Sequence, residues 1–190
     1  MTRGMFVTAL GRLDGISPDD YKASSFTDVQ GSAYYAPYVE WAVQNGIVTG
    51  TGDKQFSPDL EITREQMAVV MMNYAGQMGY SIPTPLGAVT FADNASISEW
   101  AAKEVRAMQQ TGVLMGKDGN RFDPQGKATR AEVSAALHRF VELVIDPATA
   151  QGWPKNDSGH WLYYKDGQNS PAGSSLTENG ITLTSMELWP

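Results

Sequence analysis

Apolar side chains recur with a helical period in two segments of the chain that open with the same polar pattern. One segment follows Thr63 and the other follows Thr129, with Gln66 and Glu132 standing three residues after each threonine. The apolar positions that follow are Met67, Val70, Met71, Tyr74 and Met78 in the first segment, and Val133, Ala136, Leu137, Phe140 and Val144 in the second. This i, i+3, i+4, i+7 spacing predicts two helices, each with one buried face and a capping box at its start.

A shorter helix is predicted ahead of each of these two helices. One contains Trp41, which is assigned to the core, and ends before Gly46. Its counterpart starts at the capping-box pattern Ser96-x-x-Glu99 and ends before Gly112. Turn-forming residues then lead into the longer helix, so each unit is predicted to be helix, loop, helix.

The two units are copies of one repeat, because residues 26–79 and 91–145 match at many positions 65 or 66 residues apart. The matching segments are Phe26-Thr-Asp28 with Phe91-Ala-Asp93, Tyr34 with Trp100, Gly46-Ile-Val-Thr-Gly50 with Gly112-Val-Leu-Met-Gly116, and Phe56-Ser-Pro58 with Phe122-Asp-Pro124. The chain opens with Thr2-Arg3, which resembles the Thr-Arg pairs at 63 and 129. Phe6, Leu10 and Leu13 then fall where Met67, Met71 and Tyr74 fall. Two full repeats are therefore preceded by the second half of another.

The linker between repeats and the end of the chain have a different character. Pro83 and Pro85 predict an extended linker over residues 81–90. Aromatic residues alternate between turn signals over residues 150–167, which predicts a β-hairpin, and residues 181–183 predict a short strand.

Composition and charge narrow the classes of function. The 14 Lys and Arg residues stand against 21 Asp and Glu, a net charge of −7, and this argues against nucleic acid or an anionic membrane as the main partner. The chain has no cysteine among its 190 residues, so disulfides and thiolate metal sites are excluded. No apolar run reaches about 18 residues, and the first residues lack the apolar core of a signal peptide. The low charged fraction of 18% with 19 Gly and 10 Pro favours an extracellular, sugar-handling surface.

An arginine stands at the first position of all three long helices, as Arg3, Arg64 and Arg130. A cation there opposes the helix dipole, which favours anions at that end by about 0.3–1 kcal/mol. Two explanations are open. The arginine either pairs with Asp28 or Asp93 across a repeat boundary, or joins free backbone N–H groups in binding a carboxylate or phosphate. We prefer cross-repeat pairing, Arg3 with Asp28 and Arg64 with Asp93; pairing of Asp28 with Arg64 is the alternative.

Two further repeated features are candidates for ligand contact. Tyr34 and Trp100 follow the two aspartates by six or seven residues, and a flat ring there either stacks on a sugar or caps the core. Gly50 and Gly116 close tight turns at the arginine end of each unit. A glycine permits close approach by a ligand, although the turn alone also explains it.

The sequence gives little support for catalysis. The two histidines, His138 and His160, belong to no repeated set, and nucleophile and phosphate-loop motifs are absent. Asp53, Asp118 and Asp123 miss the alternating acidic pattern of an EF-hand, so calcium is not expected. No catalytic residue, cofactor or metal is predicted.

The repeated residues closely resemble the S-layer homology (SLH) repeat over residues 1–145. The signature Thr-Arg-Ala-Glu is complete at 129–132, and is altered to Thr-Arg-Glu-Gln at 63–66 and Thr-Arg-Gly-Met at 2–5. The resemblance implies an all-α fold of tandem helix-loop-helix repeats in a pseudo-threefold bundle, with a truncated first repeat and a small β-hairpin tail. The implied divisions are 1–25 for the second half of repeat 1, 26–80 for repeat 2, 81–90 for the linker, 91–146 for repeat 3, and 147–190 for the aromatic hairpin and tail.

The resemblance also implies a function. SLH repeats are non-catalytic modules that anchor bacterial envelope proteins to secondary cell-wall polysaccharide, often through a pyruvylated terminal sugar held in grooves between repeats. The protein is then expected outside the cell, in the cell wall or S-layer. By motif match the candidate ligand-binding residues are Arg3, Asp28, Tyr34, Gly50, Thr51, Arg64, Asp93, Trp100, Gly116, Lys117 and Arg130. A third groove is expected to be incomplete, because Arg130 needs the missing opening of the first repeat.

Other interpretations stay open. The chain also fits the anchor of a larger envelope enzyme such as a glycoside hydrolase, or a self-assembling S-layer structural protein with a homo-oligomer formed through the incomplete first repeat. The tail around Trp161 resembles a single choline-binding or glucan-binding cell-wall repeat, although such sites usually need aromatic residues from successive hairpins.

Overall fold

The computed structural model describes residues 1–145, 163–165, 168–170, 176–178 and 181–183. The α-helices of this part of the chain are α1 (Arg3–Asp14), α2 (Ala36–Gln44), α3 (Arg64–Gln77), α4 (Ala102–Gln110) and α5 (Arg130–Phe140). Short 3-10 turns cover Pro18–Asp20, Asn94–Ser96 and Glu99–Ala101, and a π-helical turn, Val141–Ile145, continues α5. The all-α prediction is confirmed for residues 1–145.

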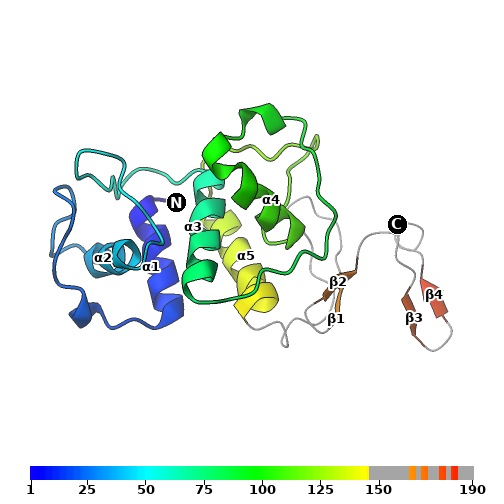
Figure 1. The fold of residues 1–190 in the computed structure, drawn as a ribbon, viewed down its shortest axis with the longest axis horizontal. Coiled ribbons are helices and arrows are strands. Elements are labelled where there is room, and N and C mark those ends of the chain that lie inside the picture. The colour runs from blue at the N-terminus through cyan, green and yellow to red at the C-terminus, as the bar shows by residue number, and fades with distance from the viewer. Residues whose placement is uncertain (146–162, 166–167, 171–175, 179–180, 184–190) are drawn as a thin grey trace.

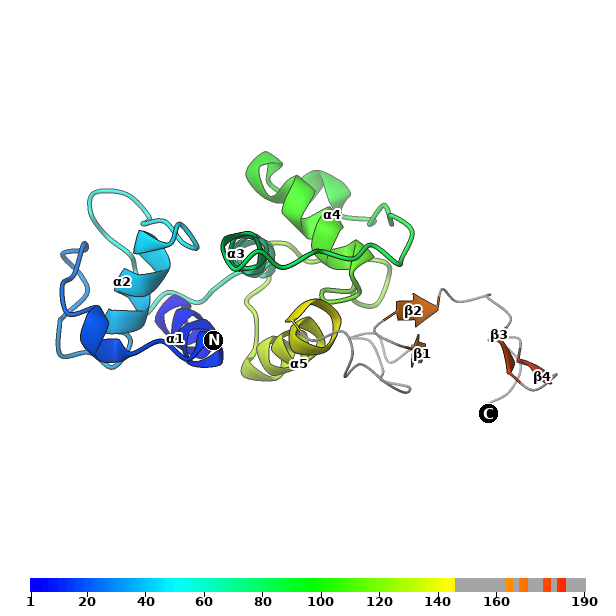
Figure 2. The same cartoon turned by 60° about the horizontal axis from the view of Figure 1, so that its bottom comes forward.

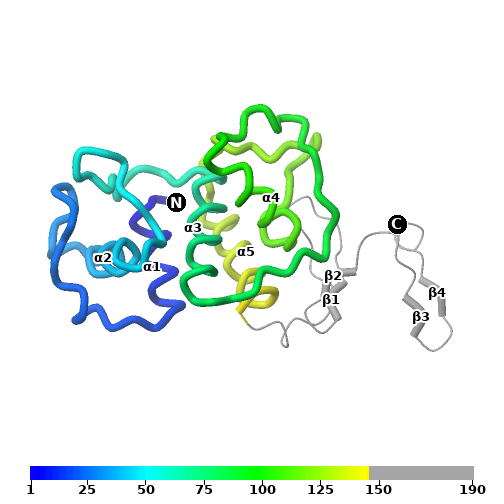
Figure 3. The backbone as a smooth tube through the Cα atoms, viewed as in Figure 1, coloured from blue at the N-terminus to red at the C-terminus, as the bar shows by residue number. Residues whose placement is uncertain are grey.

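The three long helices, α1, α3 and α5, form the centre of the fold (Figure 1). In the turned view they lie at the corners of a triangle, with α2 outside α1 and α4 beside α3 (Figure 2). The packed pairs α1 with α2 and α3 with α4 each join two successive repeats, because the second helix of one repeat packs against the first helix of the next. Figure 3 shows that the segment between α2 and α3 passes close to the N-terminus of the chain before it reaches α3.

The predicted caps set the starts of the central helices. The Thr2 hydroxyl accepts a hydrogen bond from the Met5 N–H at 3.3 Å. Complete capping boxes start α3, at Thr63, and α5, at Thr129, so both predicted boxes are confirmed. These caps satisfy N–H groups that have no partner within the helix, and they fix each arginine at the first helical position.

The predicted helix start at Ser96-x-x-Glu99 is wrong. Residues 94–101 form two 3-10 turns, and α4 begins only at Ala102. Ser98 donates hydrogen bonds from its N–H and its hydroxyl to the carboxylate of Glu65 on α3, at 3.0 Å each. A contact with the preceding repeat therefore replaces the local capping that the sequence pattern indicates.

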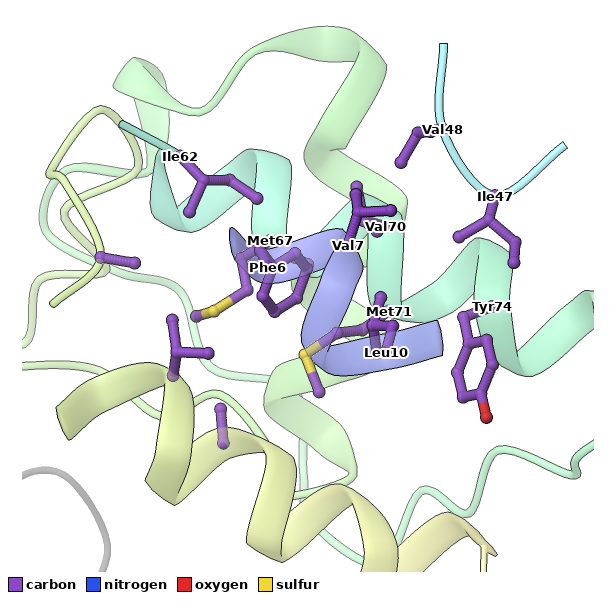
Figure 4. Close-up of a cluster of buried hydrophobic side chains, with 14 of the residues drawn as sticks. Phe6, Val7, Leu10, Ile47, Val48, Ile62, Met67, Val70, Met71 and Tyr74 are labelled. Atoms are coloured by element: carbon purple, nitrogen blue, oxygen red, sulfur yellow. The ribbon is translucent and has the colours of Figure 1, made fainter. Parts of the chain in front are cut away.

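One hydrophobic core runs through the bundle, and Figure 4 shows α1 and α3 directing side chains into it. Phe6 and Leu10 are fully buried, as are Met67 and Met71 at the equivalent positions of α3. Trp41 is 2% exposed, which confirms its assignment to the core. Leu13 is 39% exposed although its counterpart Tyr74 is buried, so the match between the two helices does not extend to this position.

Short bridges tie the starts of the central helices to one another. Thr2 pairs with Glu61, and Thr63 pairs with Lys127. The N-terminal ammonium of Met1 donates to the carbonyl of Ala128 at 2.7 Å. The first turns of α1, α3 and α5 are therefore gathered at one end of the fold, and this places their three arginines together with the loops of the repeats.

The C-terminal strands form two antiparallel pairs, β1 (Tyr163–Lys165) with β2 (Gln168–Ser170) and β3 (Leu176–Glu178) with β4 (Ile181–Leu183). The predicted strand at 181–183 is confirmed. Residues 152–162, which carry most of the resemblance to a choline-binding or glucan-binding repeat, lie outside the described residues.

Candidate functional site

Arg3 lies under the loop of the following repeat, a contact that we call the first junction (Arg3 with loop 49–57). Its Nε donates to the carbonyl of Phe56 at 3.0 Å and its Nη2 to the carbonyl of Thr49 at 3.1 Å. The guanidinium carbon lies 4.6 Å from the centre of the Phe56 ring, within the range of a cation–π contact. Burial lowers the pKa of Arg3, while the neighbouring Asp28 acts in the opposite direction.

Arg64 makes the same contacts one repeat later, at the second junction (Arg64 with loop 115–123). Its Nε donates to Phe122 O at 2.8 Å, its Nη2 donates to Met115 O at 2.7 Å, and the guanidinium carbon lies 5.0 Å from the Phe122 ring centre. The Arg64 side chain has no exposed surface. Arg3 and Arg64 therefore join repeats through backbone carbonyls, and this explains why a cation stands at an electrostatically unfavourable helix position.

The two aspartates meet the arginines at the same phenylalanines. Asp28 accepts hydrogen bonds from the backbone N–H groups of Phe56 at 2.9 Å and Ser57 at 2.7 Å. Asp93 does the same with Phe122 at 2.8 Å and Asp123 at 2.7 Å. The structure thus places Arg3 with Asp28 and Arg64 with Asp93, but no ion pair joins them within the part of the chain it describes.

Gly50 and Gly116 are needed for packing inside the same two loops. A Cβ on Gly50 would lie 2.6 Å from a ring carbon of Phe26, and one on Gly116 would lie 2.7 Å from a ring carbon of Phe91. Each phenylalanine belongs to the same repeat as its glycine. The space beside these glycines is therefore filled by the chain itself rather than open to a ligand.

Tyr34 and Trp100 lie at the surface, just before α2 and α4. Their exposed fractions are 54% and 56%, so neither ring caps the core. The ring of Tyr34 meets that of Tyr35 edge to face, with centroids 5.2 Å apart. Two aromatic rings are thus presented to solvent at equivalent positions of the two repeats.

A cleft of about 420 Å³ lies between α1 and α5, and we call it the α1–α5 cleft. Its lining is Met1, Met5, Thr8, Ala9, Arg12, Tyr34, Arg130, Val133, Ser134 and Leu137. Two of these residues are arginines and none is acidic. Unlike Arg3 and Arg64, Arg130 is exposed, and the described residues give its guanidinium no hydrogen bond or ion pair. The cleft therefore combines an apolar floor with positive charge and one exposed ring.

A group of charges surrounds Arg64 at the second junction. Lys117 Nζ lies 2.8 Å from Asp123 Oδ2 and 3.2 Å from Glu132 Oε1, and Arg64 Nη1 lies 3.3 Å from the same Glu132 oxygen. Burial alone would raise the pKa of Glu132, but hydrogen bonds from Thr129 and Lys117 outweigh it and lower this pKa to about 2. The hydrogen bond from Lys117 likewise lowers the pKa of Asp123. We call Lys117, Asp123 and Glu132 the charged cluster.

Sequence reasoning did not single out Arg12, and it did not pair Lys117 with Asp123 or Glu132. Arg12 follows Met5 and Thr8 by seven and four residues, so helical spacing places all three on one face of α1. For the charged cluster, the available signal was the alignment of the two repeats, in which three neutral side chains change to charged ones together.

No helix in the described part of the chain is long and apolar enough to cross a membrane. The amylopullulanase of Thermoanaerobacterium thermosulfurigenes is 35% identical over 142 residues, which is 75% of this chain and 8% of that protein. The exoglucanase XynX of Acetivibrio thermocellus is 34% identical over 142 residues, 75% of this chain and 13% of that protein. The S-layer protein sap of Bacillus anthracis is 28% identical over 177 residues, 92% of this chain and 20% of that protein. The chain thus spans from 8% to 20% of the length of these three relatives.

The S-layer homology domain matches residues 25–68 and 90–134. Each matched segment starts one residue before a full repeat and ends within its long helix, α3 or α5, and neither segment includes the tail that resembles choline-binding and glucan-binding repeats. S-layer homology domains are non-catalytic anchoring modules of the cell surface that bind cell-wall polysaccharide. With the same loops and capping boxes recurring at both matched segments, the chain carries two repeats of the S-layer homology domain family.

Proposed function

We propose that this chain anchors its parent protein to the bacterial cell wall by binding an acidic saccharide in the α1–α5 cleft. The ligand we favour is a terminal sugar of secondary cell-wall polysaccharide that carries a pyruvate ketal. The observation that carries the proposal is the lining of the cleft, which has two arginines, an exposed tyrosine and an apolar floor, and no carboxylate.

Each part of such a ligand has a matching group in the cleft. A guanidinium group binds a carboxylate through paired hydrogen bonds, and both Arg12 and Arg130 are exposed. The Tyr34 ring offers a flat apolar face for the C–H groups of a sugar, and Val133 and Leu137 offer apolar contact for a ketal methyl. The cleft volume of about 420 Å³ falls within the range of about 300–1,000 Å³ that is usual for small-molecule sites.

The remaining candidate residues support this site indirectly. Arg3, Arg64, Asp28 and Asp93 hold the loops of successive repeats together through Phe56 and Phe122, so we propose that they set the shape of the bundle. Trp100 offers a second exposed ring at the matching position of the next repeat, and we propose that it contacts a further sugar of the same polymer.

The identity of the parent protein is a separate matter. The relatives include an amylopullulanase, an exoglucanase and S-layer proteins, and this chain spans a small share of each. We propose that the anchored partner is a further part of the same polypeptide, either a glycoside hydrolase or an S-layer protein. The location proposed for the module is the cell wall or S-layer outside the cell.

The test is co-sedimentation of the purified chain with isolated cell-wall polysaccharide, before and after chemical removal of pyruvate. Arg130→Ala is expected to weaken binding to the untreated polymer about tenfold or more, because charge-assisted hydrogen bonds contribute about 1.5–3 kcal/mol each. Tyr34→Ala is expected to weaken it about two- to tenfold, because aromatic contacts contribute about 0.5–1.5 kcal/mol. Arg106→Ala removes an exposed arginine of α4 that does not line the cleft, and it serves as the matched control. Unchanged sedimentation of both cleft variants, or equal binding to depyruvylated polymer, contradicts the proposal.

A further inference from the structure

The two junctions share their backbone contacts, and three of the matched positions at which they differ form the charged cluster at the second junction. The first junction has Thr51, Ser57 and Gln66, and the second has Lys117, Asp123 and Glu132, each 66 residues later. At the first junction the hydroxyl oxygens of Thr51 and Ser57 lie 2.8 Å apart. At the second, the charged cluster replaces this pair of hydroxyl groups with an ammonium held by two carboxylates.

Lys117 and the exposed Arg121 are the side-chain cations of loop 115–123, and Lys117 is the one that Asp123 and Glu132 contact directly. Arg64 is completely buried, and its Nε and Nη2 are bound to backbone carbonyls, so it offers little to a solute. The Lys117 side chain is 32% exposed and that of Asp123 is 44% exposed, so the cluster is in contact with water. An acidic saccharide therefore meets an ammonium that already contacts two carboxylates, which leaves one of its three N–H groups.

The geometry also places negative charge where that ligand would have to lie. Asp123 Oδ2 lies 2.8 Å from Lys117 Nζ and Glu132 Oε1 lies 3.2 Å from the same nitrogen, so both carboxylates contact the ammonium group directly. A third carboxylate must either displace one of them or lie close to both, and like charges at such separation repel. Asp93, whose oxygens bind Phe122 and Asp123, adds a further negative charge to the same loop.

We infer that Asp123 and Glu132 act as built-in anions that keep Lys117 occupied and close the Lys117 position of the second junction to acidic saccharides. The matched positions of the first junction, Thr51, Ser57 and Gln66, carry no charge. The identity of the ligand rests on the proposed function, whereas the closure is a property of the three side chains.

The direct test opens the second junction by giving it the residues of the first. Asp123→Ser with Glu132→Gln frees Lys117, and the glutamine can retain the capping box because Gln66 makes one at the start of α3. The probe is a methyl glycoside carrying a pyruvate ketal, titrated into isotope-labelled protein, with backbone amide NMR shifts read at each site. We expect new shifts around residues 115–123 with a dissociation constant at least about tenfold lower there than in the wild type. The neutral methyl glycoside should produce no such shifts.

A second variant tests the same idea without touching the charged cluster. Thr51→Lys places an ammonium beside Ser57, where the counterparts of Asp123 and Glu132 are neutral and the Asp28 carboxylate is bound to two backbone N–H groups, and it should create a site for the ketal glycoside at residues 49–57. Thr51→Gln has similar bulk without the charge and should create none. If the double variant loses its fold, as judged by its melting temperature, Thr51→Lys alone decides.

The outcomes separate this inference from the proposed function. Folded variants with no new shifts at either junction overturn the inference, and so does wild-type binding at the second junction as tight as that of the double variant. Shifts around the α1–α5 cleft of the wild type report on the proposed function alone. If those are missing while Lys117 gains the ligand in the double variant, the proposed function fails and the inference stands.

Discussion

Replacing Glu132 by glutamine removes one negative charge from the second junction and leaves its shape nearly unchanged. The carboxylate lies 3.2 Å from Lys117 Nζ and 3.3 Å from Arg64 Nη1, and its side chain is only 21% exposed. It also accepts the Thr129 N–H at 2.8 Å as part of the capping box. A glutamine keeps this last hydrogen bond, as Gln66 does at the equivalent position, and loses the two ion pairs.

The size of the effect follows from the pKa of Glu132, which falls from 4.5 to about 2 on folding. At about 1.4 kcal/mol for each pKa unit, this corresponds to roughly 3 kcal/mol of stability at neutral pH. The Thr129 hydrogen bond that glutamine retains accounts for about 1 kcal/mol. Glu132→Gln should therefore cost about 2 kcal/mol at pH 7, a fall in Tm of about 4–8 °C for a chain of this size.

The pH dependence identifies the cause. A carboxyl whose pKa is lowered on folding stabilises the protein fully above its unfolded pKa of 4.5, and this stabilisation is lost as the pH falls toward about 2. Urea unfolding at pH 7, 5, 4 and 3 should show a constant difference between wild type and variant down to about pH 5. Below that the difference should shrink as the wild type loses its advantage.

A difference that is the same at pH 7 and pH 3 would refute this reasoning, because a pure packing defect does not depend on protonation. Lys117→Thr, which installs the residue of the first junction, provides the partner for a double-mutant cycle. We expect a coupling energy of about 1 kcal/mol between the two positions, reduced by salt. Strict additivity would show that Lys117 and Glu132 do not interact.

Three further predictions concern the loops and the cross-repeat arginines. Gly50→Ala should destabilise the protein by about 1–3 kcal/mol because its Cβ would collide with Phe26, whereas Gly31→Ala, with nothing within 4 Å, should change Tm little; equal effects would contradict the packing role. Asp28→Ala should cost about 2–3 kcal/mol in urea unfolding by leaving two backbone N–H groups without their acceptor, and a neutral result would mean that water replaces the carboxylate. Arg64→Ala should lower the free energy of unfolding by about 3 kcal/mol or more, with or without saccharide, because two backbone carbonyls lose their hydrogen-bond donor. Loss of saccharide binding with an unchanged Tm would instead favour a direct contact between Arg64 and the ligand.

The sequence predicted most of the structure that depends on local interactions. The capping boxes at Thr63 and Thr129 are decided by residues within one turn, and the structure confirms both. The predicted start of α4 was wrong because Ser98 binds Glu65, a residue 33 positions earlier in the chain. A prediction from neighbouring residues cannot include so distant a partner.

The candidate site was harder to predict than the fold. The arginines stood out because they oppose the helix dipole. The acceptors of Arg3 and Arg64, however, are backbone carbonyls. Every residue has a backbone carbonyl, so the sequence does not indicate which of them accepts a hydrogen bond. The exposure of Arg130 and its position across a cleft from Arg12 depend on how α1 and α5 lie in space. Such a distance between two helices is set by the packing of the whole bundle.

The burial of Arg3 and Arg64 has a mechanical consequence. A module fixed to a wall through one surface and to its cargo through the chain is under tension when the cargo is pulled. To separate two repeats, that tension must draw a guanidinium group out of the neighbouring loop and break its hydrogen bonds to two carbonyls at the same moment. The repeats are therefore expected to withstand a pulling force as one unit, without separating one after another.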